Sequence, residues 1–238
     1  ELGANADGYL RKEAAASTVL SRVREVLRPR ARVESRLRAG GEVRGRLDGM
    51  TTRLLLDLTR KSQPNARVAV RDSVYLYELD LREGRPLAVT RTATDGSFER
   101  GPRIFDALIG ISAGRFVVTP STAHCRDDLK LGFDELVRPR IQRARAMQRL
   151  LEARELERVD KVEIDSELVG AYLEATPEPA RGLFARLLGG MGPRELLAAA
   201  PEKRLFLEQV LADISRRGAV ISLERDGEAV DLDKAFGE

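Results

Sequence analysis

Apolar and polar residues alternate most regularly between residues 67 and 90. Three runs there, 67–70, 74–81 and 87–90, have the period-two spacing of short strands. One face of the second run is apolar and consists of Tyr75, Tyr77, Leu79 and Leu81. The other face is mixed and consists of Val74, Leu76, Glu78 and Asp80. The pattern predicts a small antiparallel sheet with one buried face.

Segments whose apolar residues have helical spacing lie on both sides of these strands in the sequence. Residues 50–62 and 102–109 each place apolar side chains on one side, and short strands are expected at 43–47 and 115–118. The polar stretch 92–101 is predicted to be a loop, and Gly114 is expected to end the second helix. The sequence therefore predicts an α+β fold in which residues 43–120 form a small antiparallel sheet with covering helices.

The two ends of the chain have other patterns. Residues 1–28 contain a strand-like run at 8–12 and a helix from Ala16 or Ser17 to Leu27, which Pro29 should end. Residues 29–42 are expected to be a linker with a short arginine-rich helix at 31–39. Residues 121–160 should form a loop and a long helix over 136–159, with Pro139 near its start. Residues 161–238 should form a strand, a helix capped by Ser166, three more helices and a terminal hairpin.

Composition narrows the function classes. The chain has 238 residues, of which 42% are hydrophobic and 33% charged, and no apolar run is long enough for a membrane helix. Glu1 is not a start methionine and no signal-peptide pattern follows, so we expect a fragment or a sequence that lacks its own beginning. The single cysteine fits a reducing compartment, and we expect a cytoplasmic protein without membrane insertion. The formal net charge of +3 does not by itself indicate a nucleic-acid partner.

Candidate chemistry is sparse. The only cysteine, Cys125, excludes an internal disulfide, and its neighbour His124 is badly placed to act as its base. No metal cluster, dinucleotide fingerprint or nucleophile motif is found, so the expectation is a non-enzymatic protein with no cofactor and no metal. Glu78 and Asp80 share a strand face and are either paired acids or, as we favour, a solvent-facing or partner-facing surface.

The long helix is strongly basic. Residues 138–158 contain seven arginines and three glutamates, a local balance of +4. Arg138, Arg145 and Arg149 are candidates for a surface that binds an acidic partner or nucleic acid. The alternative is a solvated helix with ion pairs such as Arg149–Glu152 and Glu155–Arg158. No aromatic residue lies among the arginines, so stacking on bases has no support.

Two segments resemble families of bacterial signalling proteins. Gly3-Ala4 followed by Gly8-Tyr9-Leu10-x-Lys12 and an amphipathic helix resembles the C-terminal end of a response-regulator receiver domain, although Glu13 stands where that family has proline. The resemblance implies that Lys12 contacts the phosphoryl group and that Tyr9 is the aromatic switch residue. Within this chain, an ordinary surface lysine at position 12 is the favoured alternative.

The second resemblance covers residues 43–120. Gly45-x-Leu47, the leucine-rich helix, x-Val-x-Val at 67–70, the Tyr-x-Leu hairpin and Gly114-x-Phe116 are similar to a PATAN domain. The resemblance implies a non-enzymatic module of two-component signalling that binds protein partners, in several cases linked to surface motility. Residues 161–238 resemble a winged-helix arrangement, which leaves a DNA-binding response regulator as the alternative. A protein partner is expected, DNA is less favoured, and a homodimer stays open.

Overall fold

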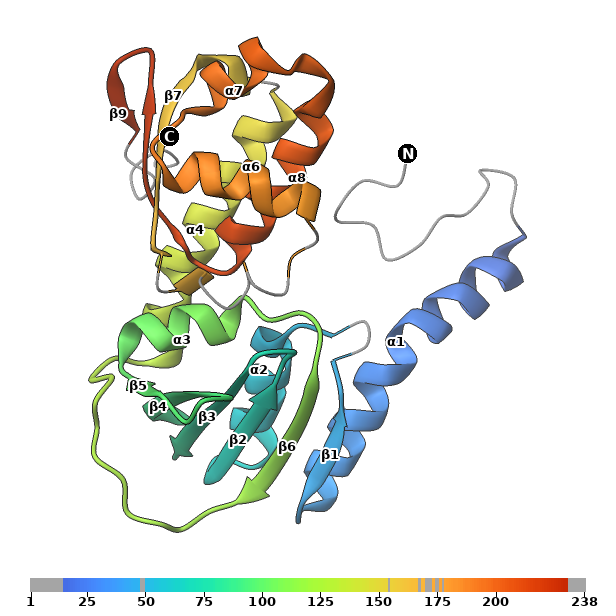
Figure 1. Ribbon diagram of the computed structural model, residues 1–238. Helices are drawn as coiled ribbons and strands as arrows, with labels where there is room; N and C mark the ends of the chain where they lie inside the picture. Colours follow the sequence, from blue (N-terminus) through green and yellow to red (C-terminus); the bar gives the residue numbers. More distant parts are fainter. Residues whose placement is uncertain are drawn as a thin grey trace.

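The computed structural model describes residues 15–47, 50–153, 155–166, 168, 169, 173, 176 and 178–230 (Figure 1). The described chain has an α+β fold with one six-stranded antiparallel sheet and one separate three-stranded antiparallel sheet. The strand expected at 8–12, with Tyr9 and Lys12, lies outside the described residues.

The larger sheet has a strand order that differs from the chain order. From one edge to the other it contains β1 (Val43–Arg46), β6 (Arg115–Pro120), β2 (Ala66–Arg71), β3 (Tyr75–Arg82), β4 (Arg85–Ala93) and β5 (Phe98–Arg100). The last of these strands to appear in the chain, β6, lies between β1 and β2. Segments that are far apart in sequence therefore lie next to each other in the sheet.

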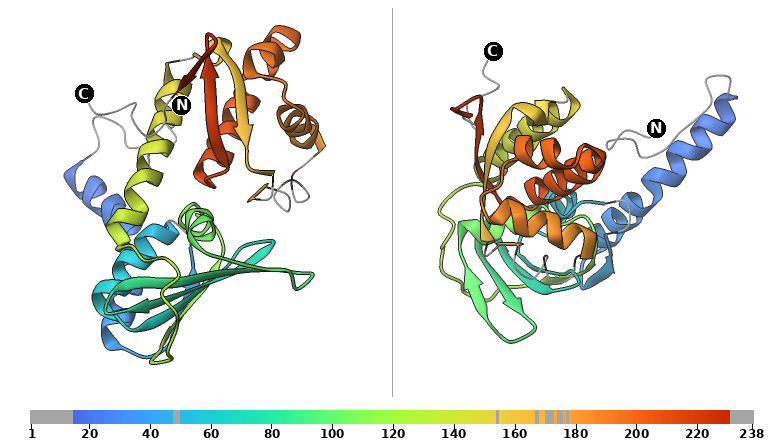
Figure 2. Two further views of the ribbon diagram at one scale, coloured as in Figure 1. Left: turned by 90° about the vertical axis from the view of Figure 1, so that its left-hand side faces the viewer. Right: turned by 45° about the horizontal axis from the view of Figure 1, so that its top comes forward.

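Helices α2 (Thr52–Ser62) and α3 (Pro102–Ile109) lie on one face of this sheet (Figure 2). That face is the apolar one: Tyr77, Leu79 and Leu81 are at most 3% exposed, as the spacing predicted. The Thr51 side chain caps α2 by accepting a hydrogen bond from the Leu54 N–H (3.3 Å), and Pro102 occupies the first turn of α3. The start of α3 was predicted from the sequence, whereas α2 begins at Thr52 and not at residue 50 as expected.

Helix α1 (Ala16–Ala39) corrects the sequence prediction. We expected Pro29 to end one helix and a linker to hold another, but a single helix runs through Pro29. A proline inside a helix lowers helix stability by about 3 kcal/mol. Contacts made by the part of α1 that follows Pro29 stabilise the helix. Leu37 is fully buried, and the Gln63 side chain donates to the carbonyls of Leu37 (3.1 Å) and Gly41 (3.0 Å).

The C-terminal part begins with α4 (Phe133–Glu152), which packs on α3 and then on α8 (Arg204–Arg216). Its remaining elements are η1 (Glu155–Arg158), β7 (Val159–Ile164), α6 (Glu178–Leu188), α7 (Pro193–Ala199), η2 (Pro201–Lys203), β8 (Val220–Arg225) and β9 (Glu228–Val230). The three strands form the second sheet in the order β7-β8-β9. The turn at Asp226-Gly227, with φ of 52° and 80°, is the predicted hairpin.

Three further expectations were wrong. The long helix spans Phe133–Glu152 rather than 136–159, because Val159 already belongs to β7. The predicted loop at 92–101 contains the end of β4 and all of β5, which pair with each other. Helix α3 ends at Ile109, before Gly114. In addition, the Leu168 N–H donates to the Asp165 carboxylate (3.1 Å), so Asp165 makes the capping contact expected of Ser166.

The sheet and the C-terminal part meet through close backbone contact and a buried arginine. A Cβ atom at Gly110 would lie 1.8 Å from the Arg216 carbonyl oxygen, so only glycine fits there. Arg140 of α4 is 7% exposed and packs against Gly218. Burial lowers the pKa of Arg140 to about 10, while Asp106 acts in the opposite direction. Arg103 and Asp165 add an ion pair across the junction.

Candidate interaction surface

The face of the large sheet opposite α2 and α3 is covered by no described helix, and we call it the open face (Figure 2). Its side chains are those that alternate with the buried ones along each strand. Strand register arranges them in rows that cross the sheet. The middle row consists of Arg44, Val117, Ala69, Glu78, Thr90 and Arg100. The open face is therefore polar and charged along most of its width.

Glu78 and Asp80 both lie on the open face, half-buried among their neighbours. Asp80 stands directly opposite Arg67, whose Nε and Nη2 donate to its carboxylate at 2.8 and 3.0 Å. This hydrogen bonding raises the pKa of Arg67. Residues two apart on a strand are about 7 Å apart, so the two carboxylates do not share a proton. Asp80 is instead held in an ion pair with Arg67 on the surface of the sheet.

Three arginines occupy adjacent positions in the next row. Arg46, Arg115 and Arg71 stand directly opposite one another on β1, β6 and β2, and all three side chains are exposed. We call this set the arginine row. Like charges directly opposite each other on a sheet destabilise it. The contacts within the arginine row therefore do not stabilise the sheet.

The same row changes character toward the other edge of the sheet. Beyond Arg71 it continues through Leu76, Thr92 and Phe98, and it contains no acidic residue. Phe98, on the edge strand β5, is 59% exposed. The open face therefore presents positive charge at one edge and an exposed aromatic ring at the other. Arginine and aromatic side chains are enriched at protein interfaces.

Residues 121–130 border the open face near Asp80. Arg82 donates to the Ser121 carbonyl (3.2 Å), and Arg85 pairs with Asp127 (2.5 Å). Burial raises the pKa of the Cys125 thiol, and the charge of Asp80 acts in the same direction. A thiol with a raised pKa is protonated at neutral pH and is a poor nucleophile. His124 is exposed, and Arg82 and Arg67, which act to lower the pKa of the Cys125 thiol, do not outweigh its burial.

The arginines of α4 do not join the open face. Arg138, Arg145 and Arg149 are exposed, and their spacing of seven and four places them on one side of α4. Because α4 packs on α3, this helix rises from the covered side of the sheet. The expected ion pair Glu155–Arg158 is present at 3.8 Å, and Glu152 accepts a hydrogen bond from the Gln148 side chain (2.7 Å). The sequence candidates thus fall on two separate surfaces.

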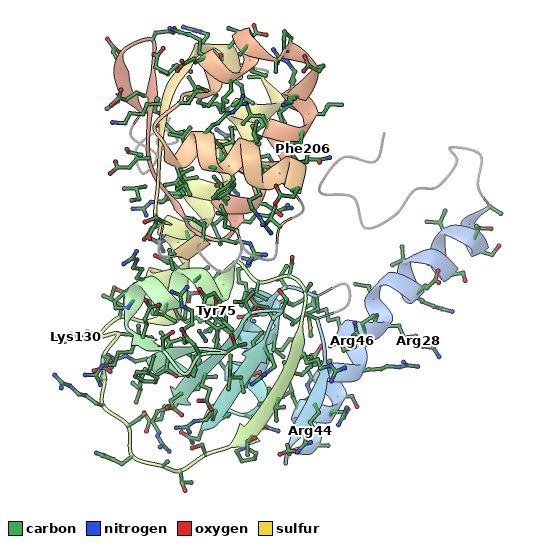
Figure 3. The ribbon with its side chains drawn as sticks, in the orientation of Figure 1. Arg28, Arg44, Arg46, Tyr75, Lys130 and Phe206 are labelled. Atoms are coloured by element: carbon green, nitrogen blue, oxygen red, sulfur yellow. The ribbon has the colours of Figure 1, made fainter. Side chains whose placement is uncertain are left out.

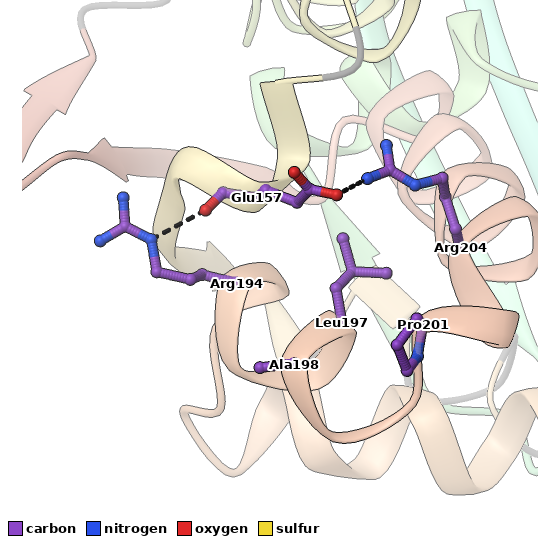
Figure 4. A pocket seen from close by; sticks show the side chains of 6 residues that line it. All are labelled: Glu157, Arg194, Leu197, Ala198, Pro201 and Arg204. Atoms are coloured by element: carbon purple, nitrogen blue, oxygen red, sulfur yellow. Dashed lines mark hydrogen bonds and ion pairs between the residues drawn. The ribbon is translucent and has the colours of Figure 1, made fainter.

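Charged side chains also converge at a hollow in the C-terminal part (Figure 4). It is lined by Glu157, Arg194, Leu197, Ala198, Pro201 and Arg204. Arg194 pairs with Asp160 (2.5 Å) and Asp226 (2.6 Å), and its Nε donates to the Glu157 carbonyl (2.8 Å). Arg204 pairs with the Glu157 carboxylate. These contacts join α7, α8 and η1, so the hollow is best explained as a packing junction.

The described residues contain no group of histidine, cysteine or carboxylate side chains that could hold a metal ion. In the same part of the chain, no helix combines the length and apolar character needed to cross a membrane.

Comparison of the chain with protein-family models, with curated proteins and with solved structures found no match. The geometry of the open face therefore carries the functional argument.

Proposed function

We propose that the chain is a non-enzymatic signal-output module of a bacterial response-regulator-type protein, and that its PATAN-like sheet domain binds a protein partner through the open face. The observation that carries this proposal is the arginine row. Arg71 and Arg115 of this row are exposed and directly opposite each other, and like charges in this arrangement oppose sheet stability. A partner with acidic side chains would neutralise them. The exposed Phe98 ring at the far end of the row supplies an apolar contact.

The proposal also uses the sequence resemblances at the two ends of the chain, to a receiver domain and to a winged helix. The receiver-like motif with Tyr9 and Lys12 would supply the input, and residues 161–238 would form a winged-helix-like unit. The arginines at the two ends of α8 support a structural role for that unit rather than DNA binding. Arg204 pairs with Glu157, and Arg216 pairs with Asp213 (2.5 Å). A DNA-reading helix more often presents a basic face without such acidic partners.

The test is affinity capture from bacterial lysate with the whole chain as bait. The variant Arg71→Glu/Arg115→Glu reverses two charges of the arginine row, whereas the matched control Arg138→Glu/Arg145→Glu reverses two exposed charges on α4. We expect a specific protein that the wild type and the control retain and that the row variant loses. Circular dichroism of all three proteins checks that each is folded.

Two outcomes would contradict the proposal. Equal loss of the captured protein in both variants would show that net charge, and not the open face, determines binding. Enrichment of DNA without any specific protein, followed by a gel shift that weakens at rising salt, would instead support the DNA-binding alternative.

A further inference from the structure

The open face holds two kinds of arginine, which differ in their ion pairs. Outside the arginine row, three arginines of this face have carboxylate partners: Arg44 pairs with Glu42, Arg67 with Asp80 (2.8 Å) and Arg100 with Asp128 (3.9 Å). Among the described residues, no ion pair joins Arg71 or Arg115 to a carboxylate, and both side chains are exposed. These two positive charges are therefore not neutralised by the described part of the chain.

Arg71 and Arg115 stand directly opposite each other on the neighbouring strands β2 and β6. Directly opposite residues of antiparallel strands have Cα atoms about 4.5–5.5 Å apart, so both guanidinium groups can reach a single anion. Arg46 follows in the row, at the end of β1 that is nearer the C-terminal part (Figure 3). The acidic residue Glu78 belongs to the neighbouring row, and its charge acts to raise the pKa of Arg67.

The backbone below these side chains is held by close contacts. Gly114 precedes Arg115 and has a φ of 146°, and a Cβ atom there would lie 2.5 Å from the Arg71 carbonyl oxygen. The Leu47 N–H donates to the Gly114 carbonyl (2.9 Å). The adjoining ends of β1, β2 and β6 are thus fixed relative to one another, and the positions of the arginines are set before any ligand arrives.

The Arg67–Asp80 pair on the same face shows how much anion one arginine takes up. The Nε and Nη2 atoms of Arg67 donate to the two carboxylate oxygens of Asp80 at 2.8 and 3.0 Å. One arginine thus occupies both oxygens of one carboxylate. A phosphoryl group has three terminal oxygens and a charge of about −2 at neutral pH, which matches two guanidinium groups that face each other.

The row continues from Arg71 through Leu76 and Thr92 to the exposed ring of Phe98, without another basic residue. A nucleic acid carries a phosphate at every nucleotide, so it would be poorly matched to this half of the row. A segment of protein with one phosphoryl group and an apolar side chain further along fits both halves. Phe98 lies three strands from Arg71, about 14 Å at 4.8 Å per strand, which an extended chain spans in about four residues.

We propose that Arg71 and Arg115 bind a phosphorylated side chain of the protein partner, and that Phe98 contacts an apolar side chain about four residues away in an extended segment. This inference rests on the proposed function, because it names the group that the partner presents to the open face. A second copy of the chain offers no such group from its own open face, where Asp80 is already paired with Arg67.

The experiment uses the whole chain and a fluorescein-labelled synthetic peptide with one central phosphoserine and a leucine four positions to either side. Its remaining residues are alanine, glycine and serine. We expect saturable binding by fluorescence anisotropy. The same peptide with serine or glutamate in place of phosphoserine should bind at least about tenfold more weakly, because a serine or a single carboxylate makes fewer charge-assisted hydrogen bonds.

Matched variants locate the binding site. Arg71→Gln/Arg115→Gln should weaken phosphopeptide binding at least about tenfold. The control Arg138→Gln/Arg145→Gln removes the same charge from α4 and should change binding less than about twofold at 0.15 M salt. Circular dichroism checks that both variants are folded.

Phe98 is tested with a second peptide that has alanine in place of both leucines. Phe98→Ala should weaken binding of the leucine peptide about threefold. It should leave binding of the alanine peptide unchanged. Equal effects on both peptides would contradict the proposed apolar contact.

Three results would overturn the phosphate assignment. The first is equal binding of the phosphoserine and glutamate peptides, and the second is equal weakening by the two arginine variants. The third is tighter binding of a single-stranded oligonucleotide, or of vesicles containing phosphatidic acid, that Arg71→Gln/Arg115→Gln abolishes.

The capture experiment with Arg71→Glu/Arg115→Glu keeps this inference distinguishable from the proposed function. A captured protein that this variant loses, together with no preference for phosphoserine over glutamate, would remove the phosphate assignment alone. A captured protein that the variant retains would remove both.

Discussion

The two faces of the large sheet are built from the same strands but place arginine in opposite environments, buried on one face and exposed on the other. On the covered face Arg91 is 4% exposed, lies 4.3 Å from the centre of the Tyr75 ring and pairs with Glu99. On the open face the arginine row is exposed, and its members stand opposite one another. The comparison teaches that the fold supplies a carboxylate and an aromatic ring to the arginine that it buries, whereas the arginines of the row are exposed to solvent.

The largest expected effect is on the free energy of unfolding, and it appears when a leucine on each face of β3 is replaced by alanine. Leu79 is fully buried on the covered face, so Leu79→Ala should lower the free energy of unfolding by about 2–5 kcal/mol. Leu76 is half-buried on the open face, and Leu76→Ala should cost about 1 kcal/mol. Urea unfolding of both variants measures the difference. Equal losses would mean that the open face is packed against something.

A smaller effect concerns the arginine row itself. Arg115 lies between Arg46 and Arg71, so Arg115→Gln should raise the free energy of unfolding by about 0.2–1 kcal/mol at low salt. The gain should shrink at about 0.5 M salt, where charges are screened. The control Arg67→Gln removes the ion pair with Asp80 and should not stabilise. A gain that is independent of salt would refute the electrostatic explanation.

The smallest expected effect is a change in the free energy of unfolding with pH, caused by the ionisation of Asp106 on the covered side of the sheet. Burial raises the pKa of Asp106, although Arg140 and Arg143 act to lower it. The folded protein therefore binds this proton more tightly than the unfolded chain does. Ionised Asp106 lowers stability at neutral pH, and stability recovers as the pH falls through the raised pKa. Asp106→Asn should stabilise at neutral pH, and the gain should disappear in acid.

Asp57 supplies a control of opposite sign for the Asp106 measurement. Burial acts to raise the pKa of Asp57, but hydrogen bonds from Lys61 and Arg60 outweigh it and leave the pKa lowered. Its stabilising contribution is present at neutral pH and is lost as the pH falls through the lowered pKa. Asp57→Asn should therefore destabilise at neutral pH. Denaturant titrations across the acid range distinguish the two signs, and parallel curves for both variants would contradict the assignment.

The sequence predicted those features that depend on neighbouring residues. Period-two spacing identified the buried face of β3, and local chemistry identified the start of α3 at Pro102 and the terminal hairpin at Asp226-Gly227. The predicted position of Glu78 and Asp80 on a face without a helical cover also follows from this spacing. Their role as a partner surface stays a prediction.

Features that depend on distant contacts were missed. Local rules end a helix at Pro29, whereas burial of Leu37 and the hydrogen bonds from Gln63 keep α1 continuous. Strand β5 has only three residues and no pattern of its own, so only its pairing with β4 reveals it. The arginine row combines residues 46, 71 and 115, which lie in three separate segments. No pattern within a sequence window brings them together.

The position of β6 has a consequence for how the chain is made. Because β6 lies between β1 and β2, neither of these strands has its native neighbour on that side until residues 115–120 have left the ribosome. Strands β2 to β4 pair locally and can form a hairpin meander earlier. During synthesis, the edge of that meander at β2 is an open template for pairing with other nascent chains. Insertion of β6 closes it, and the arginine row is assembled in the same event.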